Sequence, residues 1–73
     1  MAETFQAEVT GQVREVLVAP GDGVSEADPM VVLESMKLPV RVLSTGDGVV
    51  VAVHVAEGDT VGPGQPLVDV VIE

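Results

Sequence analysis

Short runs of alternating apolar and polar residues make up most of this chain, and clusters of glycine, proline and acidic residues separate them. Alternation with a period of two indicates half-buried β-strands, and such clusters indicate tight connections between strands. No stretch shows a 3.6-residue period over a useful length, so the pattern predicts no helix. The predicted strands span residues 4–9, 11–18, 30–34, 38–43, 49–56 and 67–72, with Val24 as an isolated apolar position.

The chain contains an internal repeat with a spacing of 37 positions. Residues 11–34 align with residues 48–71 without a gap, and ten of the twenty-four aligned positions are identical. Each copy is a strand–turn–strand unit that is too small to bury its own apolar face, so the two copies are expected to pack together with approximate two-fold symmetry. We therefore predict an all-β fold, a flattened β-barrel or β-sandwich.

The composition supports a single β-domain over residues 1–73. A chain of this length has no room for a second core. It has no cysteine and one histidine, so disulfide or metal staples are not available to it. Eighteen valines must supply the core, and valine favours strands because its β-branched side chain is restricted in helices.

The formal net charge of −9 limits the partners that the chain can have. It argues against nucleic acid and against anionic membrane surfaces, both of which would repel an acidic domain. The acidic surface has two compatible interpretations: solubility of a valine-rich sheet protein, or recognition of a basic partner. Without a signal-like segment or a span of about 20 apolar residues, a cytoplasmic monomer is expected.

Lys37 is the only lysine, and it lies where the two halves of the repeat meet. Connections between strands normally use Asn, Gly, Asp or Pro, because these residues tolerate tight turns. Here the residues are Met36 and Lys37, followed by Leu38, which suggests that the turn was selected for another property. The alternatives are an ordinary surface lysine, and a core position for Met36 and Leu38.

A two-residue hairpin turn fits this junction. With Met36–Lys37 as the central residues, Ser35 and Leu38 form the closing pair and Glu34 faces Pro39 in the next pair. Proline is tolerated there because its missing N–H would have pointed away from the partner strand. A type I′ turn would hold both central residues at positive φ, which is uncommon outside glycine.

The stretch Glu34-Ser35-Met36-Lys37-Leu38 resembles the attachment motif of biotinyl domains, the carboxyl-carrier modules of biotin-dependent carboxylases. In that family the motif reads Glu, then Ala or Ser, then Met-Lys-Met, and the lysine is biotinylated. The resemblance extends over essentially the whole chain. The similar framework positions are Gly11, Val13, Gly48 and Val50, with the Gly-Asp turns at Gly21 and Gly58.

The resemblance implies a carrier that is not itself an enzyme. A biotin protein ligase would attach biotin to Lys37, and the arm would carry a carboxyl group between biotin carboxylase and carboxyltransferase sites. Glu34, Ser35, Met36 and Leu38 would form the surface that these enzymes read. The implied fold is a barrel-sandwich hybrid of two four-stranded antiparallel sheets with pseudo-two-fold symmetry.

Two features refine the resemblance. Leu38 replaces the usual second methionine of the biotinyl motif. Lipoyl domains of the same fold typically carry Asp before the lysine and Ala after it, so Met36 and Leu38 favour biotin over lipoate. Some biotinyl domains carry a protruding thumb loop in the first half, but the two halves here align without an insertion, which predicts a thumbless domain. The alternatives are a lipoyl carrier of acyl groups and an interaction module not coupled to carboxyl transfer.

The remaining polar residues suggest no further chemistry. His54 lies between Val53 and Val55, which alternation places inward, so we expect it to face outward as a bystander. The acidic residues are spread over every loop without metal-ligand spacing, so no metal site is expected. One isolated histidine and no cysteine leave no catalytic triad.

Overall fold

Every regular element in the computed structural model, which describes residues 2–73, is a β-strand. The strands are β1 (Ala2–Gln6), β2 (Gly11–Val16), β3 (Gly23–Val24), β4 (Pro29–Ser35), β5 (Leu38–Leu43), β6 (Gly48–Val53), β7 (Thr60–Val61) and β8 (Pro66–Ile72). The described residues contain no helix long and apolar enough to cross a membrane.

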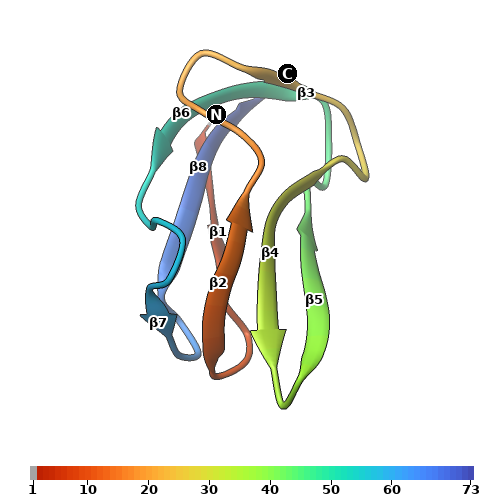
Figure 1. Ribbon diagram of the computed structural model, residues 1–73. Coiled ribbons are helices and arrows are strands. Elements are labelled where there is room, and N and C mark those ends of the chain that lie inside the picture. The colour runs from red at the N-terminus through yellow and green to blue at the C-terminus, as the bar shows by residue number, and fades with distance from the viewer. Residues whose placement is uncertain (1) are drawn as a thin grey trace.

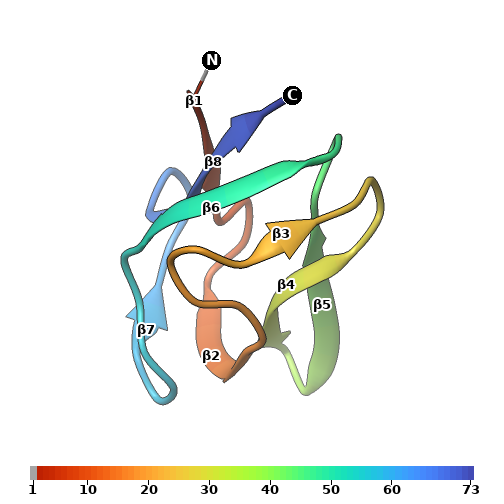
Figure 2. The same ribbon diagram turned by 90° about the horizontal axis from the view of Figure 1, so that it is seen from above.

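The strands form two antiparallel sheets of four strands each. The first sheet has the order β1-β8-β6-β3 and the second has the order β5-β4-β2-β7. The two sheets pack face to face in an elongated body with principal extents of 34 × 18 × 17 Å (Figures 1 and 2). This confirms the predicted all-β fold, in the form of a flattened sandwich rather than a closed barrel.

The internal repeat extends further in the structure than in the sequence. A shift of 37 positions carries β1–β4 onto β5–β8 strand by strand. It includes β1 and β5, whose aligned residues share no identity. The Gly-Asp turns match in detail, because Asp22 Oδ2 accepts a 2.9 Å hydrogen bond from Ala19 N and Asp59 Oδ2 accepts one of 2.9 Å from Ala56 N.

The core lies between the sheets and is built from inward-facing aliphatic side chains of both halves. Burying such a side chain stabilises the fold by about 1.5–3 kcal/mol, and valine supplies seven of the twelve buried hydrophobic residues. The buried hydrophobic residues are Phe5, Ala7, Val13, Val24, Met30, Val31, Leu33, Val50, Val61, Leu67, Val68 and Val70. Nine of them have a relative exposure of 2% or less, so the space between the sheets is filled by a core that solvent does not reach.

Three predicted strands are wrong at their ends, and the one predicted over residues 11–18 ends at Val16. The strand predicted over residues 4–9 spans Ala2–Gln6, because the chain beyond it bonds to a turn of the second half. Ala7 N donates to the carbonyl of Gln65 and Ala7 O accepts from Gly64 N, both at 2.9 Å. The strand predicted over residues 49–56 ends at Val53, since the main chain beyond it enters the Gly-Asp turn.

Candidate functional site

The connection between β4 and β5, residues Ser35–Leu38, is a tight turn that we call the lysine turn. Met36 and Lys37 both have positive φ, at 52° and 67°. Ser35 pairs with Leu38, and Glu34 pairs with Pro39 in the next register position. The predicted type I′ geometry and register are therefore confirmed.

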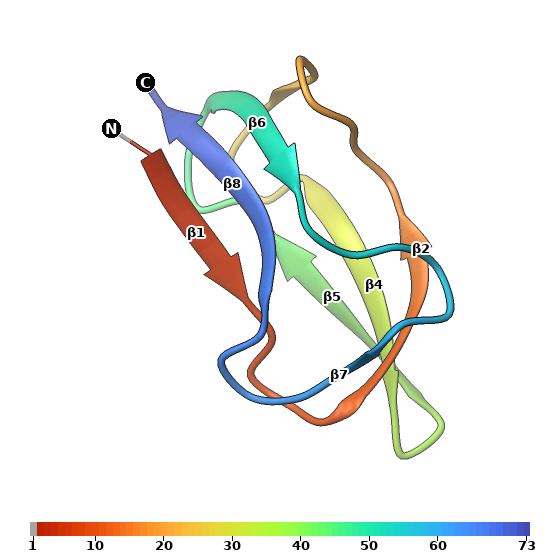
Figure 3. The ribbon, with the colours of Figure 1, turned by 90° about the vertical axis from the view of Figure 1, so that its left-hand side faces the viewer.

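The lysine turn projects from the end of the body that lies opposite both chain termini (Figures 1 and 3). This follows from the pseudo-symmetry, since the position equivalent to Lys37 in the second half lies just beyond Glu73. The second half therefore ends in the terminus where the first half turns. Lys37 is exposed to solvent at this end of the body.

Two large apolar side chains flank Lys37 in solvent. Met36 has a relative exposure of 92% and Leu38 of 65%. This excludes the alternative in which they belong to the core. Leaving each of them exposed forgoes about 1.5–3 kcal/mol of burial free energy. Lys37 therefore has an exposed apolar side chain on each side of it in the sequence.

Two contacts hold the base of the lysine turn against β2 and the loop before it. Ser35 Oγ donates a 2.8 Å hydrogen bond to the carbonyl oxygen of Thr10. The guanidinium of Arg14 forms an ion pair with the carboxylate of Glu34. Arg14 lies at a β-bulge in β2, between the register positions of Val13 and Glu15, and such bulges re-aim a side chain. Sequence reasoning missed both contacts, because a bulge leaves no mark in the alternation pattern.

The bulge also helps to place all three cations of the chain on one surface. Arg14, Lys37 and Arg41 line a shallow groove on the outer face of the second sheet, which we call the lysine groove. Lys37 and Arg41 come from the lysine turn and the adjoining strand β5, and Arg14 comes from β2, which is distant in sequence. A chain with twelve acidic residues thus keeps its positive charge next to the lysine turn.

His54 forms the one ion-pair contact found on the outer face of the first sheet within residues 2–73. Its Nε2 lies 2.9 Å from Asp69 Oδ2. The hydrogen bond from His54 lowers the pKa of Asp69 below its ordinary value. His54 faces outward as predicted. Its pairing with Asp69 was not foreseen, because His54 directly follows β6 and Asp69 lies in β8.

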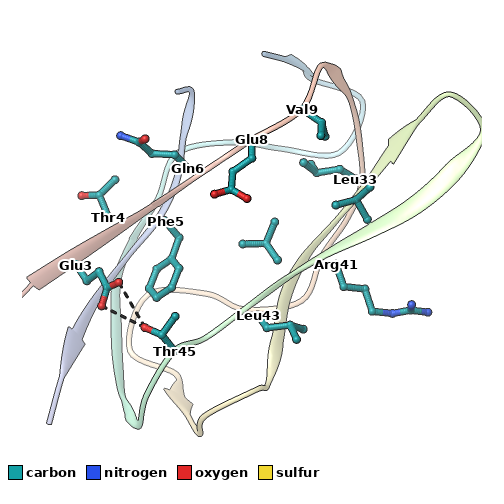
Figure 4. A pocket seen from close by; sticks show the side chains of 12 residues that line it. Glu3, Thr4, Phe5, Gln6, Glu8, Val9, Leu33, Arg41, Leu43 and Thr45 are labelled. Carbon is teal, nitrogen blue, oxygen red and sulfur yellow. Dashed lines mark hydrogen bonds between the residues drawn. The ribbon is translucent and has the colours of Figure 1, made fainter. Parts of the chain in front are cut away.

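A second hollow opens between the edge strands β1 and β5 (Figure 4), and no residue of the lysine turn lines it. Core side chains such as Phe5 and Leu33 reach it. At one side the hydroxyl of Thr45 lies 3.3 and 3.4 Å from the two carboxylate oxygens of Glu3. The hollow is therefore the seam where the two sheet edges approach each other. Within residues 2–73, no three His, Asp or Glu side chains are grouped to hold a metal ion.

Comparison with known proteins assigns the chain to a family. The family model described as "Biotin-requiring enzyme", which covers biotin and lipoyl attachment domains, matches residues 1–70. The chain therefore belongs to this family.

Two relatives of known name cover most of the chain. The biotinylated protein TB7.3 homolog of Mycobacterium leprae is 42% identical over 65 residues, which are 89% of this chain and 92% of the relative. The biotin carboxyl carrier protein of Streptococcus mutans is 39% identical over 69 residues, which are 94% of this chain. The chain spans about half of that second relative, since the match covers 53% of its length.

Solved structures share the fold closely. A domain of a single-chain, multi-domain long-chain acyl-CoA carboxylase superposes with a TM-score of 0.93 and 29% identity, covering 99% of this chain and 7% of that one. The lipoyl domain of the 2-oxoglutarate dehydrogenase complex from Azotobacter vinelandii gives a TM-score of 0.80 and 28% identity, covering 93% of this chain and 94% of that domain. The fold is therefore shared with a part of an acyl-CoA carboxylase and with a lipoyl domain.

Proposed function

We propose that this chain is a biotin carboxyl carrier domain and that Lys37 is its attachment residue. One observation carries the proposal: the sole lysine occupies a strained two-residue turn, flanked by exposed Met36 and Leu38, at the end of a rigid sandwich. An economical turn would use residues that tolerate positive φ. The observed turn instead presents an amine between the exposed apolar side chains of Met36 and Leu38.

In the attachment reaction the domain supplies the nucleophile and the ligase supplies the catalysis. The neutral ε-amine of Lys37 attacks the acyl carbon of biotinyl-adenylate. A C–N bond forms, the C–O bond to the phosphate breaks, AMP leaves, and the amine proton passes to a base of the ligase or to water. The flexible stem of lysine allows the amine to enter the ligase site while the turn backbone stays outside it.

The four residues around Lys37 divide into two roles in this proposal. Met36 and Leu38 are free in solvent, so they form the surface that the ligase and the carboxylase read. Ser35 and Glu34 are engaged with their own domain, through Thr10 and Arg14, and they act as positioning residues that fix the base of the turn.

The fold does not discriminate between biotin and lipoate, so the choice depends on the residues beside Lys37, which favour biotin. The structural likeness includes both a carboxylase domain and a lipoyl domain. Met36 and Leu38 differ from the Asp and Ala that typically flank the lysine of lipoyl domains. The named relatives described above are biotin proteins as well.

Once attached, biotin supplies a ring nitrogen that can take up and release a carboxyl group. The residues present fit this cofactor, since Lys37 is exposed and the termini lie at the opposite end. The lysine stem would reach a biotin carboxylase site and then a carboxyltransferase site. Tethering keeps the group at an effective concentration of about mM near either site, which replaces a diffusive encounter with a local search.

The proposal is tested by offering the purified chain two modification systems in parallel. One contains biotin protein ligase, biotin and ATP, and the other contains lipoate ligase, lipoate and ATP. Intact mass spectrometry should show one biotinyl group per chain and no lipoyl group. A variant with Met36→Asp and Leu38→Ala, which copies the lipoyl pattern, should lose most of its biotinylation. A lipoyl adduct on the parent chain would contradict the proposal.

The carrier role needs a second measurement. The biotinylated chain is incubated with a biotin carboxylase, ATP and isotopically labelled bicarbonate, and label on the protein is measured after rapid gel filtration. Label should accumulate on the biotinylated chain and not on the unmodified chain. If only free biotin became labelled, the chain would be a biotinylated interaction module instead of a carboxyl carrier.

A further inference from the structure

The lysine groove, defined above by Arg14, Lys37 and Arg41, has an apolar floor. Leu17, which follows β2, Val32 of β4 and Pro39 of β5 line it together with the cations. Leu17 has a relative exposure of 45%, although a leucine normally favours the interior. The groove thus combines aliphatic surface, two guanidinium groups and the carboxylates of Glu15 and Glu34 beside the proposed attachment residue.

The two arginines of the groove differ in what they bind. Arg14 pairs with Glu34. Arg41 forms no ion pair among residues 2–73, which leaves its guanidinium donors free. Arg41 faces Val32 directly in the β4–β5 register. A neutral group with an apolar body and a carbonyl acceptor would complement the aliphatic side chain of Val32 and the free guanidinium of Arg41.

The opposite sheet shows that the fold does not require this surface. Under the 37-residue shift, Leu17 corresponds to His54 and Val32 corresponds to Asp69. On the first sheet those positions are occupied by the His54–Asp69 pair, whose atoms are 2.9 Å apart. The same backbone therefore carries a polar, ion-paired surface on one face and an exposed aliphatic one on the face beside Lys37.

We propose that the lysine groove is the resting site of the biotin ring carried on Lys37 of the same molecule. This inference rests on the proposed function. The sulfur-containing ring and valeryl chain would cover Leu17 and Val32, and the ureido carbonyl would accept a hydrogen bond from Arg41. Val32 lies three residues along β4 from Ser35, a distance of about 10 Å. The lysine stem and the valeryl chain together can span this distance.

The tether makes even weak docking significant. A group on a short flexible arm has an effective concentration of about mM at a nearby site. An intrinsic dissociation constant of about mM would therefore leave the ring docked about half of the time. Such docking shields the ring between encounters and still releases it to an enzyme, because any carboxylase site that binds biotin more tightly than this competes successfully.

The test compares methyl and arginine Nε–H chemical shifts of the unmodified and biotinylated chain by NMR, after intact mass has established full biotinylation. Docking predicts shift changes at Leu17, Val32 and Arg41 that do not vary with protein concentration. Changes confined to residues 35–38, or changes at the groove that grow with concentration, would overturn the proposal. A chain that fails to become biotinylated would instead refute the proposed function, so the two failures are distinguishable.

A matched pair of variants makes the test specific. Leu17→Glu places a charge in the groove, and Val51→Glu places one on the outer face of the first sheet at a similar exposure, 45% against 48%. On biotinylation, Leu17→Glu should lose at least half of the shift change at Val32, and Val51→Glu should keep it. Equal effects of the two variants would also overturn the proposal.

Discussion

Gly11 and Glu34 pack so closely that a β-carbon on Gly11 would overlap the carbonyl oxygen of Glu34. The same relationship recurs in the second half, where Gly48 lies against the carbonyl oxygen of Val71. The two glycines therefore set how closely β2 approaches the end of β4 and how closely β6 approaches the end of β8. Only the first of these contacts lies beside the lysine turn.

This symmetry separates stability from recognition. Gly11→Ala and Gly48→Ala should each lower the free energy of unfolding by about 1–3 kcal/mol, because each added methyl group must displace backbone. Gly11→Ala should also slow biotinylation under conditions where both variants are fully folded, since it shifts Glu34. Urea titration and a ligase time course measure the two effects. Equal biotinylation rates for the two variants would show that the base of the turn does not matter to the ligase.

Ala27 occupies a backbone conformation that favours glycine. Its φ is 72°, and its equivalent in the second half, Gly64, has a φ of 88°. Ala27→Gly should raise the free energy of unfolding by about 0.5–1 kcal/mol, because relief of the steric cost exceeds the extra entropy of the unfolded chain. Gly64→Ala should lower it by a similar amount. Thermal unfolding of both variants checks the prediction, and a destabilised Ala27→Gly would contradict it.

Met36 offers a test of recognition without a change in stability. Since the side chain is 92% exposed, Met36→Ala should change the free energy of unfolding by less than about 0.5 kcal/mol. Its rate of biotinylation should nevertheless fall, because the ligase loses an apolar contact beside the amine. A suitable control is Val49→Ala, an exposed aliphatic residue on the outer face of the first sheet, which should react at the parent rate. A Met36→Ala variant as reactive as the parent would remove Met36 from the recognition surface.

The His54–Asp69 pair predicts an acid-side dependence of stability. Because the hydrogen bond from His54 lowers the pKa of Asp69 in the folded chain below its ordinary value of 3.8, the folded chain binds this proton less readily than the unfolded chain does. The contribution is therefore fully present above about pH 3.8 and is lost as the pH falls through the folded pKa. Asp69→Asn should flatten the dependence of unfolding free energy on pH in this range, and His54→Gln should flatten it in part. Curves parallel to that of the parent would contradict this role.

The sequence was informative about the fold because its two halves repeat the same constraints. The Gly-Asp turns, the buried valines and the proline that begins each long strand recur at one spacing, so an error in one half would conflict with the other. The first strand was misplaced because Phe5, Ala7 and Val9 alternate without interruption. Only the cross-half hydrogen bonds of Ala7 show that the strand ends at Gln6.

At the site, the turn could be predicted and its supports could not. Positive φ at Met36 and Lys37 follows from a two-residue loop between strands of fixed register. The Arg14–Glu34 pair depends on a β-bulge, and the hydrogen bond from Ser35 to Thr10 joins the end of β4 to a loop distant in sequence. Such contacts are decided by tertiary approach, so local patterns do not encode them.

The central claim is that the ε-amine of Lys37 is the group acylated by biotin, and one measurement tests it directly. The parent chain and Lys37→Arg are incubated with biotin protein ligase, biotin and ATP, and modified peptides are sequenced by tandem mass spectrometry. We expect one biotin on residue 37 of the parent and none on Lys37→Arg, with circular dichroism showing the same β-structure for both. A parent chain that stays unmodified, or a variant that still carries biotin, would contradict the account.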